Sequence, residues 1–543
     1  MSESPEPSEA ASSAPAPLGG GGARGAQLVA AGILLSKVFG LVRERAFAHY
    51  FGNSDAGDAF KAALKIPNFL QNLFGEGVLS ASFIPVYARL LAKGDPAVAR
   101  RLASAVATLL ALLTSVLCLL GVLVTPFLID TIAPGFTGEK RLQTIRLVQI
   151  FFPGVGLLVM SAWCLGILNS HRRFFLSYAA PVLWNVAIIA ALFWFGGSVH
   201  DYALAEKVAW GLVVGSALQF AVQVPLALRL VGGVTPQLAL ALDETRTVLR
   251  NFLPVVASRG VVQLSAYVDN VIASLLPSGA VSVMAYAQTL YLLPISVFGM
   301  SVSAAQLPAM ASVTGTPVEV ADALRAQLDR GLRQVAFFIV PSVVALMGLG
   351  DVVVAALYQG GAFDEDSTRS VWAVLAGASL GMLAATQGRL YASAFYALGD
   401  TRTPFRFAAI RVALTICLGA VAALLVPGWL GVDARWGTVG LSVASGLAGW
   451  VEFLALRAAL NRRIGTTGLV VAALLRLWGA ALPAAAVAFA VKLALGTALH
   501  PTLRGVVVLG LFGAIYVGIA WMLGVAEARS TLSRVLARVR RPR

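Results

Sequence analysis

Charged side chains gather between Gly57 and Pro85, although the chain around this stretch is strongly apolar. An α-helix turns by about 100° per residue, so a helical stretch here would carry its polar side chains in one narrow stripe. The members of this stripe are Asp58, Lys61, Lys65, Asn68, Asn72 and Glu76. An ionised side chain near the middle of a bilayer costs from about 2.5 to well over 10 kcal/mol, so it persists only where it faces a bundle interior or water. The stripe therefore predicts a hydrated cavity.

The segment before this stretch adds further charge. It holds two charged residues on one helical face, Lys37 and Glu44, and two beside them, Arg43 and Arg45. A hairpin around residues 53–55 would place Arg43 and Lys65 at similar depth, facing one cavity. Basic side chains on both sides of a cavity suit phosphate or diphosphate, which Arg holds bidentately and Lys as a point charge. For Asp58 and Lys61 a second interpretation stays open, in which both only reach to the membrane interface.

The second half of the chain has fewer ionisable residues within its apolar segments. They are Arg259, Asp269, Arg389 and Arg411. Arg259 and Asp269 belong either to the site or to a structural pair, but ten helical positions separate them by about 15 Å, so direct pairing needs an intervening helix. For Arg389 and Arg411 the sequence favours a structural role.

The composition predicts an all-α polytopic membrane protein. The 543 residues are 58% hydrophobic and 12% charged, with a mean hydropathy of +0.81. Soluble domains are about 45–50% apolar and about 25% charged. Apolar windows of about 20 residues or more predict some fourteen transmembrane helices. They lie at 26–52, 57–91, 98–129, 141–169, 176–196, 202–230, 250–276, 281–312, 320–349, 367–397, 404–427, 437–461, 468–495 and 502–526.

The basic residues cluster in every second loop. These loops carry Arg89, Lys93, Arg100, Arg101, Arg172, Arg173, Arg229, Arg246, Arg250, Arg325, Arg330, Arg333, Arg402, Arg406, Arg457, Arg462 and Arg463. The opposite loops are often acidic, as in NSDAGD (residues 53–58) and FDEDST (residues 363–368), so the positive-inside rule places both termini in the cytoplasm. The formal net charge of +15 is therefore a topology signal rather than a sign of nucleic-acid binding, with a share of it facing anionic lipid headgroups.

The remaining features indicate no cofactor and no metal site. The three cysteines, Cys118, Cys164 and Cys417, lie within apolar runs, where they are expected to pack as small hydrophobic residues. Residues 1–25 read as a disordered tail and residues 528–543 as a basic cytoplasmic tail.

Two parts of the chain share a layout. Pro67, Phe74-Gly75 and Pro85 recur as Pro294, Phe298-Gly299 and Pro308. The offset of six helices predicts a parallel repeat of two lobes, residues 26–235 and 243–463, with two further helices in residues 464–527. Two such lobes can rock about a central site, which is a transporter architecture. Chance similarity between apolar segments is the alternative that the sequence leaves open.

Two motifs identify a family resemblance. SKVFGLVRERAFAHYFG (residues 36–52) and DAFKAALKIPNFLQNLFGEGVLSASFIPVYA (residues 58–88) resemble the MurJ (MviN) family, the bacterial lipid II flippases of the multidrug/oligosaccharidyl-lipid/polysaccharide exporter superfamily. Residues 278–299, 357–363 and 395–404 support the likeness. The resemblance implies fourteen helices, a central cationic cavity, and a groove from the last two helices that receives a polyprenyl tail. The matching site positions are Lys37, Arg43, Glu44, Asp58, Lys65, Asn68 and Glu76.

The chain departs from the family pattern at two positions. Gln71 and Thr289 stand where many members have arginine. Lys61 or Arg259 is a candidate to replace the lost charge. The departure leaves room for a related polyprenyl-linked saccharide as substrate.

The expected function is therefore transport. By resemblance, the chain flips lipid II, an undecaprenyl-diphosphate-linked muropeptide, from the inner to the outer leaflet of the bacterial cytoplasmic membrane by alternating access. The resemblance adds membrane lipids and cell-wall synthesis proteins as partners, and implies no cofactor and no enzymatic activity.

Two rival functions are weaker. An exporter of amphiphilic drugs on the same scaffold would couple to an ion through an acid such as Asp269, but a site for cations should expose carboxylates rather than a Lys/Arg cluster. A membrane enzyme has its best support in the DxD pattern of residues 364–366, a metal-binding type, which lies in a short outer loop. The chain has no GxxxxGK[ST] loop for nucleotide phosphates.

Overall fold

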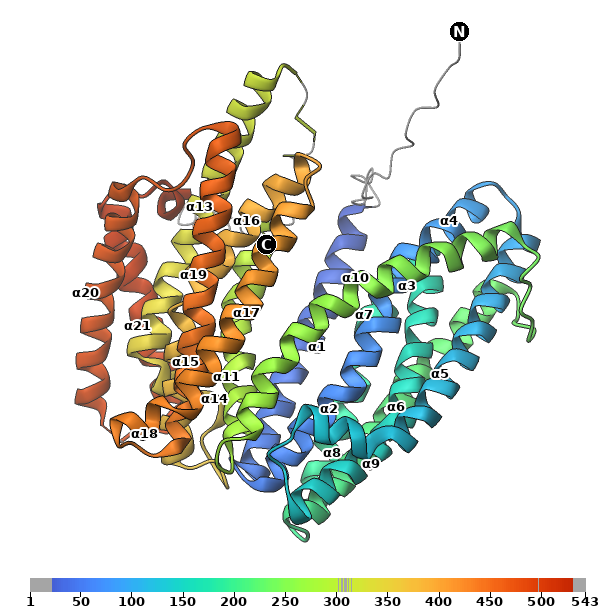
Figure 1. The fold of residues 1–543 in the computed structure, drawn as a ribbon, viewed down its shortest axis with the longest axis horizontal. Helices are drawn as coiled ribbons and strands as arrows, with labels where there is room; N and C mark the ends of the chain where they lie inside the picture. Colours follow the sequence, from blue (N-terminus) through green and yellow to red (C-terminus); the bar gives the residue numbers. More distant parts are fainter. Residues whose placement is uncertain are drawn as a thin grey trace, which may run out of the picture.

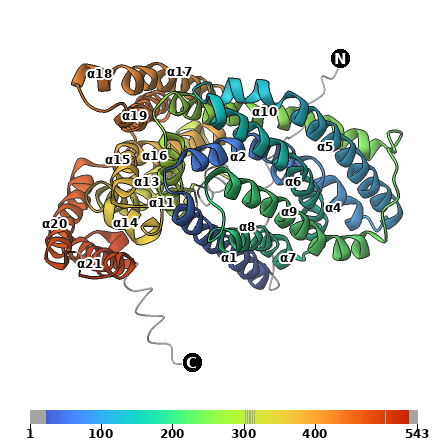
Figure 2. The ribbon, with the colours of Figure 1, turned by 90° about the horizontal axis from the view of Figure 1, so that it is seen from below.

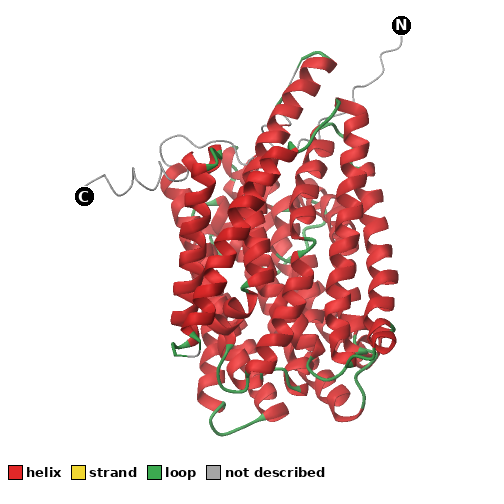
Figure 3. Cartoon of the chain, turned by 90° about the vertical axis from the view of Figure 1, so that its left-hand side faces the viewer, coloured by secondary structure: helices red, strands yellow, loops and turns green. Residues whose placement is uncertain are grey.

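The computed structural model of the chain describes residues 22–300, 302–303, 306, 310, 312–313, 315–496 and 498–530, with the side chains of 22–30, 76, 257–266 and 300 outside this set. Within these residues the secondary structure is helical, apart from one isolated β-bridge between Gly360 and Phe363 (Figure 3). An all-α fold satisfies its backbone hydrogen bonds within each helix, which a membrane-spanning chain requires.

The first nine helices form one bundle, here called the N-lobe. Their bounds are α1 (Gly22–Phe51), α2 (Asp55–Phe74), α3 (Glu76–Ser82), α4 (Ile84–Ala92), α5 (Pro96–Ile132), α6 (Gly138–Ser170), α7 (Phe174–Ala179), α8 (Pro181–Phe195) and α9 (Asp201–Val231). The segment expected at 57–91 is broken into α2, α3 and α4. The breaks fall at Gly75 and at Phe83, close before Pro85, in keeping with the reluctance of glycine and proline to continue a helix.

The second bundle, the C-lobe, contains most of the remaining helices. Their bounds are α11 (Ala280–Pro294), the π-helix η1 (Ile295–Met300), α13 (Pro317–Gly348), α14 (Gly350–Tyr358), α15 (Glu365–Ser379), α16 (Met382–Ala397), α17 (Arg402–Leu424), α18 (Val426–Leu430), η2 (Ala434–Trp436) and α19 (Gly437–Ile464). The last two helices, α20 (Val471–Leu495) and α21 (Pro501–Met522), pack on each other and on its outer side.

The two lobes meet at one end and diverge towards the other (Figure 1). The end where they meet carries the acidic loops around residues 53–58 and 363–368 and is called the acidic end; the opposite end carries the arginine-rich loops and is called the basic end. Helix α10 (Asp243–Ser274) runs diagonally between them. It contacts α2, α3, α4 and α5 of the N-lobe as well as α11 and α17 of the C-lobe, so it closes one side of the space between the lobes (Figures 1 and 2).

Helices occupy all fourteen segments expected from hydropathy. Among the described residues, ten are long and apolar enough to cross a membrane, or eleven if α15 and α16, which meet at 41°, form one span. Helices α1, α2 and α10 are not among them. Charge lowers the hydropathy of α2, which contains Asp55, Asp58, Lys61 and Lys65 within 20 residues. The count of fourteen spans thus stays a prediction, whereas the all-helical membrane architecture is confirmed.

The core near the acidic end is aromatic and shared by both lobes. Phe47 of α1 packs against Phe60 of α2, with ring centroids 5.0 Å apart. On the other side, Tyr286 of α11 contacts Phe363 at 5.4 Å and Tyr358 at 5.1 Å. Large apolar side chains are also exposed along the outer helices, as expected where lipid rather than water surrounds the protein.

Candidate functional site

A buried carboxylate joins the two lobes at the acidic end. Asp58 of α2 is 1% exposed and accepts hydrogen bonds from the backbone N–H groups of Gly279 (2.8 Å) and Ser282 (2.7 Å) at the start of α11. These N–H groups lack partners within their own helix, and the helix dipole favours a negative charge there. Lys140 of α6 lies 2.8 Å from Asp58 and 2.6 Å from Asp55. Asp58 is therefore buried in a contact between the lobes.

Backbone contacts extend this closure. The Tyr286 hydroxyl donates to the carbonyl of Gly52 (3.2 Å), and the N–H of Ala362 donates to the carbonyl of His49 (2.7 Å). Gly52 has a φ of +51°, and a Cβ added there would lie 2.3 Å from the Ala362 oxygen. Only glycine fits this close approach. The lobes are thus sealed together at the acidic end in this conformation.

Next to the seal lies a buried cluster of three charges. Glu44 of α1 is 7% exposed; one of its oxygens lies 2.7 Å from the Arg43 guanidinium, and the other accepts from Lys61 of α2, which is 9% exposed. Arg43 also donates to Asn185 of α8 (3.1 Å) and lies over the Trp184 ring. Lys61 lies over two aromatic rings, one from each lobe. The cluster holds one net positive charge.

A cavity of about 590 Å³ extends from this cluster between the lobes. Its walls come from α1 and α2, from α10, and from α11, α15, α16, α17 and α19. Six acidic or basic side chains line it: Glu44, Lys61, Lys65, Asp269, Arg389 and Arg411. Four cations against two carboxylates give the lining a net positive charge, which suits an anionic ligand.

The charges on the N-lobe wall follow the period of helix α2. Lys61, Lys65, Asn68 and Asn72 recur at intervals of four, three and four residues, so they stand on one face and rise towards the basic end. Four of the six members of the stripe seen in the sequence thus share one face of α2 beside a cavity; Asp58 and Glu76 are not among the residues that line it. The Tyr267 hydroxyl donates to the carbonyl of Lys65 (2.6 Å), which ties α10 to this face.

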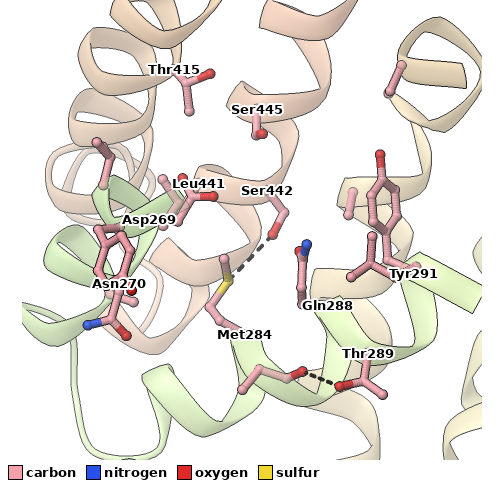
Figure 4. Close-up of a pocket in the computed structure, with 18 of the residues that line it drawn as sticks. Asp269, Asn270, Met284, Gln288, Thr289, Tyr291, Thr415, Leu441, Ser442 and Ser445 are labelled. Carbon is pink, nitrogen blue, oxygen red and sulfur yellow. Dashed lines mark hydrogen bonds between the residues drawn. The ribbon is translucent and has the colours of Figure 1, made fainter. Parts of the chain in front are cut away.

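The C-lobe wall presents neutral polar groups together with its cations. Figure 4 shows Gln288, Thr415 and Ser445 around one space, contributed by α11, α17 and α19. Ser442 donates to the sulfur of Met284 (3.7 Å), as drawn in the figure. One oxygen of Asp269 is buried without a hydrogen-bond partner among the described residues. The wall therefore has unused hydrogen-bonding capacity for a polar ligand.

The structure separates the residues expected at the site into groups. Five line the cavity: Glu44, Lys61, Lys65, Asn68 and Asp269. Asp58 lies in the seal. Arg43 faces α8 within the N-lobe, and the exposed Lys37 donates to Ser296 of η1 (3.3 Å); neither lines the cavity wall. The side chains of Glu76 and Arg259 lie outside the described residues. The binding role of each stays a prediction.

The structure adds information on three charged residues. Arg389 and Arg411, for which the sequence favoured structural roles, both line the cavity. The available signal was that both are arginines inside apolar segments, where an unpaired charge indicates function. Lys140, which pairs with Asp55 and Asp58, was not singled out. Its signal was the acidic loop at residues 53–58, which needs a cationic partner.

The acidic pattern at residues 364–366 is engaged in local structure. Asp364 caps α15 by accepting from the N–H of Ser367 (2.8 Å), Glu365 pairs with Arg369, and Asp366 pairs with Arg435. The N–H of Ser367 also lowers the pKa of Asp364. Among the described residues, no group of three or more His, Cys, Asp or Glu side chains could hold a metal. The three cysteines are free thiols.

Comparison with known sequences gives a consistent picture. Residues 47–513 match the family model described as "Lipid II flippase MurJ". A probable lipid II flippase MurJ of Rhizobium meliloti is 30% identical over 512 residues, which are 91% of this chain and 92% of that protein. The lipid II flippase MurJ of Burkholderia cenocepacia is 32% identical over 435 residues, 78% of this chain and 81% of that one.

Solved structures agree at the level of the fold. A lipid II flippase MurJ in an inward closed conformation superposes with a TM-score of 0.74 at 23% identity, covering 91% of this chain and 98% of that one. An inward-facing multidrug resistance transporter of the MATE family, within the MOP superfamily, gives a TM-score of 0.63 at 15% identity, covering 82% of this chain and all of that one. The two-lobe arrangement is therefore a known transporter fold.

Proposed function

The chain belongs to the lipid II flippase MurJ family, and we propose that it flips lipid II across the bacterial cytoplasmic membrane by alternating access. The observation that supports this proposal most directly is the cationic cavity, which has one wall from each lobe and is sealed at the acidic end. A transporter needs such a site between two mobile bodies.

The basic end is proposed to face the cytoplasm, with both termini on that side. This follows from the arginine-rich loops at that end and the acidic loops at the other. The lobes diverge towards the basic end, so the conformation described here is proposed to receive its substrate from the cytoplasmic leaflet (Figure 1).

The proposed cargo is the diphosphate-linked headgroup. Moving a charged phosphate out of water into a low-dielectric region costs free energy, and the cations of the cavity offset that cost. With the cell interior negative, the outward movement of an anion is favoured by about 2.3 kcal/mol per charge per 100 mV. A cationic side chain that moved outward with the headgroup would reduce this drive.

Release requires the seal at the acidic end to break. When α11 moves away, Asp58 loses its two backbone donors, but Lys140 belongs to the same lobe and stays beside it. Removing one partner of a buried ion is strongly destabilising, whereas an ion that keeps its counter-charge avoids most of that cost. Lys140 therefore lowers the free energy of the outward-open state.

The polyprenyl tail is proposed to stay in the membrane beside the last two helices. Helices α20 and α21 expose a series of large apolar side chains. Among them are Leu475, Leu482, Leu493, Leu503 and Val506, each more than half exposed. Membrane lipids and cell-wall synthesis proteins are the further proposed partners, and lysine and arginine at the basic end suit anionic headgroups.

A second candidate is an ion-coupled exporter of amphiphilic molecules. The buried, unpartnered oxygen of Asp269 favours it, because a carboxylate in a cavity can take up a proton or a cation. The four lining cations favour an anionic cargo instead.

The experiment that tests the proposed function is depletion of the protein in its native cell. We expect lipid II to accumulate in the cytoplasmic leaflet, and wild-type protein supplied in trans to restore its movement. Lys65→Gln should fail to restore it, whereas Arg406→Gln, which changes an exposed arginine outside the cavity, should succeed. Normal lipid II distribution after depletion would contradict the proposal.

A further inference from the structure

A second cavity lies on the outside of the C-lobe. It has a volume of about 460 Å³ and lies between α17 and α19, beside the short helix α18. We call it the α18 groove. Every residue that lines it is Leu, Val, Ala, Gly, Pro or Trp. Figure 2, which views the molecule from the acidic end, shows these three helices at one edge of the C-lobe. The groove is therefore an apolar feature of the lipid-facing surface.

The groove has a defined shape. At its floor, a Cβ added to Gly440 of α19 would lie 2.3 Å from the carbonyl oxygen of Ala422 on α17, so the two helices touch. The larger Leu418 and Leu447 also line the groove and are exposed. The chain leaves α18 through Gly431, whose φ of +66° is a conformation that favours glycine. Close helix packing below and a fixed turn above thus form the groove before any ligand binds.

The depth of the groove matches one leaflet of a membrane. Its lining on the α19 side runs from Trp436 to Leu447, which is about 16 Å at a helical rise of 1.5 Å per residue. The hydrocarbon core of a bilayer is about 30 Å thick, so one leaflet contributes about 15 Å. Trp429 of α18 and Trp436 are both exposed at the acidic end, and tryptophan is enriched at membrane interfaces. The groove therefore reaches from the interface to about the middle of the bilayer.

Three charges stand at the mouth of the groove. The Arg435 guanidinium lies over the ring of Trp436, 5.5 Å from its centroid. Its Nη1 donates to Asp366 (2.9 Å), and an oxygen of Asp433 lies 3.9 Å from its Nε. The bond to Asp366 is its one side-chain hydrogen bond among the described residues, so other N–H donors stay available to a phosphate. The two exposed carboxylates can accept hydrogen bonds from an ammonium group.

We infer that the α18 groove binds one phospholipid of the outer leaflet, of the phosphatidylethanolamine type. One acyl chain lies between α17 and α19, the phosphate contacts Arg435, and the primary ammonium contacts Asp433 and Asp366. Phosphatidylglycerol has no ammonium for the two acids, and the quaternary ammonium of phosphatidylcholine has no N–H to donate. This inference goes beyond the proposed function and depends on it only for the orientation that makes the acidic end the outer one.

Other occupants fit the groove less well. Helix α19 separates the groove from the central cavity, because Ser442 and Ser445 line the cavity whereas Val443 and Ala444 line the groove. A polyprenyl tail is also much longer than one leaflet is deep. A transmembrane helix of a partner would cross both leaflets and extend well beyond the groove. A phospholipid matches both the depth of the groove and the charges at its mouth.

The test uses the full-length protein in phosphatidylcholine nanodiscs, in the absence of lipid II. A small fraction of a photoreactive phospholipid is added, with the same diazirine-containing acyl chain and an ethanolamine, glycerol or choline headgroup in separate samples. After illumination, mass spectrometry of the peptides gives the labelled positions.

Three variants address the parts of the site. Arg435→Gln removes the phosphate contact, Asp433→Asn removes one acid but keeps an oxygen that can cap η2, and Val421→Phe fills space in the groove. The matched controls are Arg369→Gln, an exposed arginine at the same end, and Val487→Phe, an exposed valine on α20.

We expect the ethanolamine probe to label residues 418–447 more strongly than the other two probes. Arg435→Gln should need about 10- to 100-fold more of this probe for equal labelling, the range for one lost charge-assisted hydrogen bond. Asp433→Asn should weaken labelling by the ethanolamine probe alone, and Val421→Phe should weaken labelling by all three. Both controls should label as the wild type does.

Two results would overturn the inference. Labelling spread over the lipid-facing helices in proportion to their exposed area, and unchanged in Val421→Phe, would show that the groove holds no particular lipid. Equal labelling by the ethanolamine and glycerol probes, unchanged in Asp433→Asn, would show that the charges do not select the headgroup. Val421→Phe leaves the three charges intact, so it tests the groove even if Arg435→Gln fails to fold. Lipid II is absent throughout, so the proposed function stands whichever result is found.

Discussion

The two walls of the cavity handle charge in opposite ways. On the N-lobe side, the ions next to the seal are buried and paired: Asp58 with Lys140, and Glu44 with Arg43 and Lys61. On the C-lobe side, Arg389 is exposed and has no carboxylate partner within 4 Å among the described side chains, and Arg411 is partly exposed and pairs with Glu452. Buried ions must be paired to persist, whereas hydrated ones can stay free for a ligand. The N-lobe wall is therefore preorganised next to the seal, whereas Lys65 further along α2 and Arg389 on the C-lobe wall offer charge that has no carboxylate within 4 Å among the described side chains.

The largest change in stability is expected when the central acid of the N-lobe cluster is removed. Glu44→Gln leaves the buried Lys61 and the partly buried Arg43 without a counter-charge, and breaking a buried pair in this way costs about 3–5 kcal/mol of stability. Thermal unfolding of the purified protein in detergent measures the loss. The double variant Glu44→Leu/Lys61→Met should regain much of it, because no unpaired lysine remains. Equal losses in the single and double variants would contradict the paired description.

A second variant tests the seal between the lobes. Asp58→Asn keeps the size of the side chain but removes the charge that holds Lys140 and the start of α11, and each hydrogen bond to a charged group is worth about 1.5–3 kcal/mol. We expect the closed acidic end to open more often, measured as faster alkylation of a cysteine placed at Gln288 by a membrane-impermeant reagent added outside intact cells. The control is Asp366→Asn, whose partner Arg435 is exposed. Unchanged alkylation in Asp58→Asn would show that the carboxylate does not hold the seal.

A smaller effect is expected on the C-lobe wall. Arg411→Gln removes a partner of Glu452, but the Arg411 side chain is 41% exposed, so the pair contributes about 0.2–1 kcal/mol. Its loss should barely change the melting temperature while it weakens lipid II binding measurably. A destabilisation as large as that of Glu44→Gln would erase the difference between the walls.

The smallest effect concerns an acid outside the membrane-spanning helices. Asp400 accepts from the N–H of Thr403 and pairs with Arg463, which lower its pKa to about 2. A depressed pKa in the folded state means that the stabilisation is present above the usual pKa of an aspartate and is lost as the pH falls towards 2. Asp400→Asn should therefore flatten the stability profile between about pH 4 and pH 2. An unchanged acid profile would show that these bonds do not contribute.

The fold was largely predictable because its signal is local. Apolar windows placed all fourteen segments on helices, and the 3.6-residue period placed Lys61, Lys65 and Asn68 on one face. The period cannot say which neighbour that face meets. In α1, Arg43 points to Asn185 within its own lobe while the adjacent Glu44 reaches the cavity, a distinction set by the packing of α8.

Two further features could not be predicted from the sequence because they depend on contacts between helices that are distant in the chain. The diagonal course of α10 across both lobes depends on tertiary contacts with helices far away in the chain. The cavity position of Arg389 depends on the bend at Gly381 and its contact with Gly446. Neither the bend nor the contact has a signature in hydropathy, and glycines are common in membrane helices.

The most direct test of the central claim uses vesicles that contain lipid II and the purified protein. The rate at which lipid II from the inner leaflet becomes accessible to an added, membrane-impermeant enzyme is compared for the wild type and for Lys65→Gln/Arg389→Gln. We predict rapid transfer by the wild type and transfer at the protein-free rate by a correctly inserted double variant. Equal transfer by both proteins would contradict the claim that cations from the two lobes carry the diphosphate headgroup.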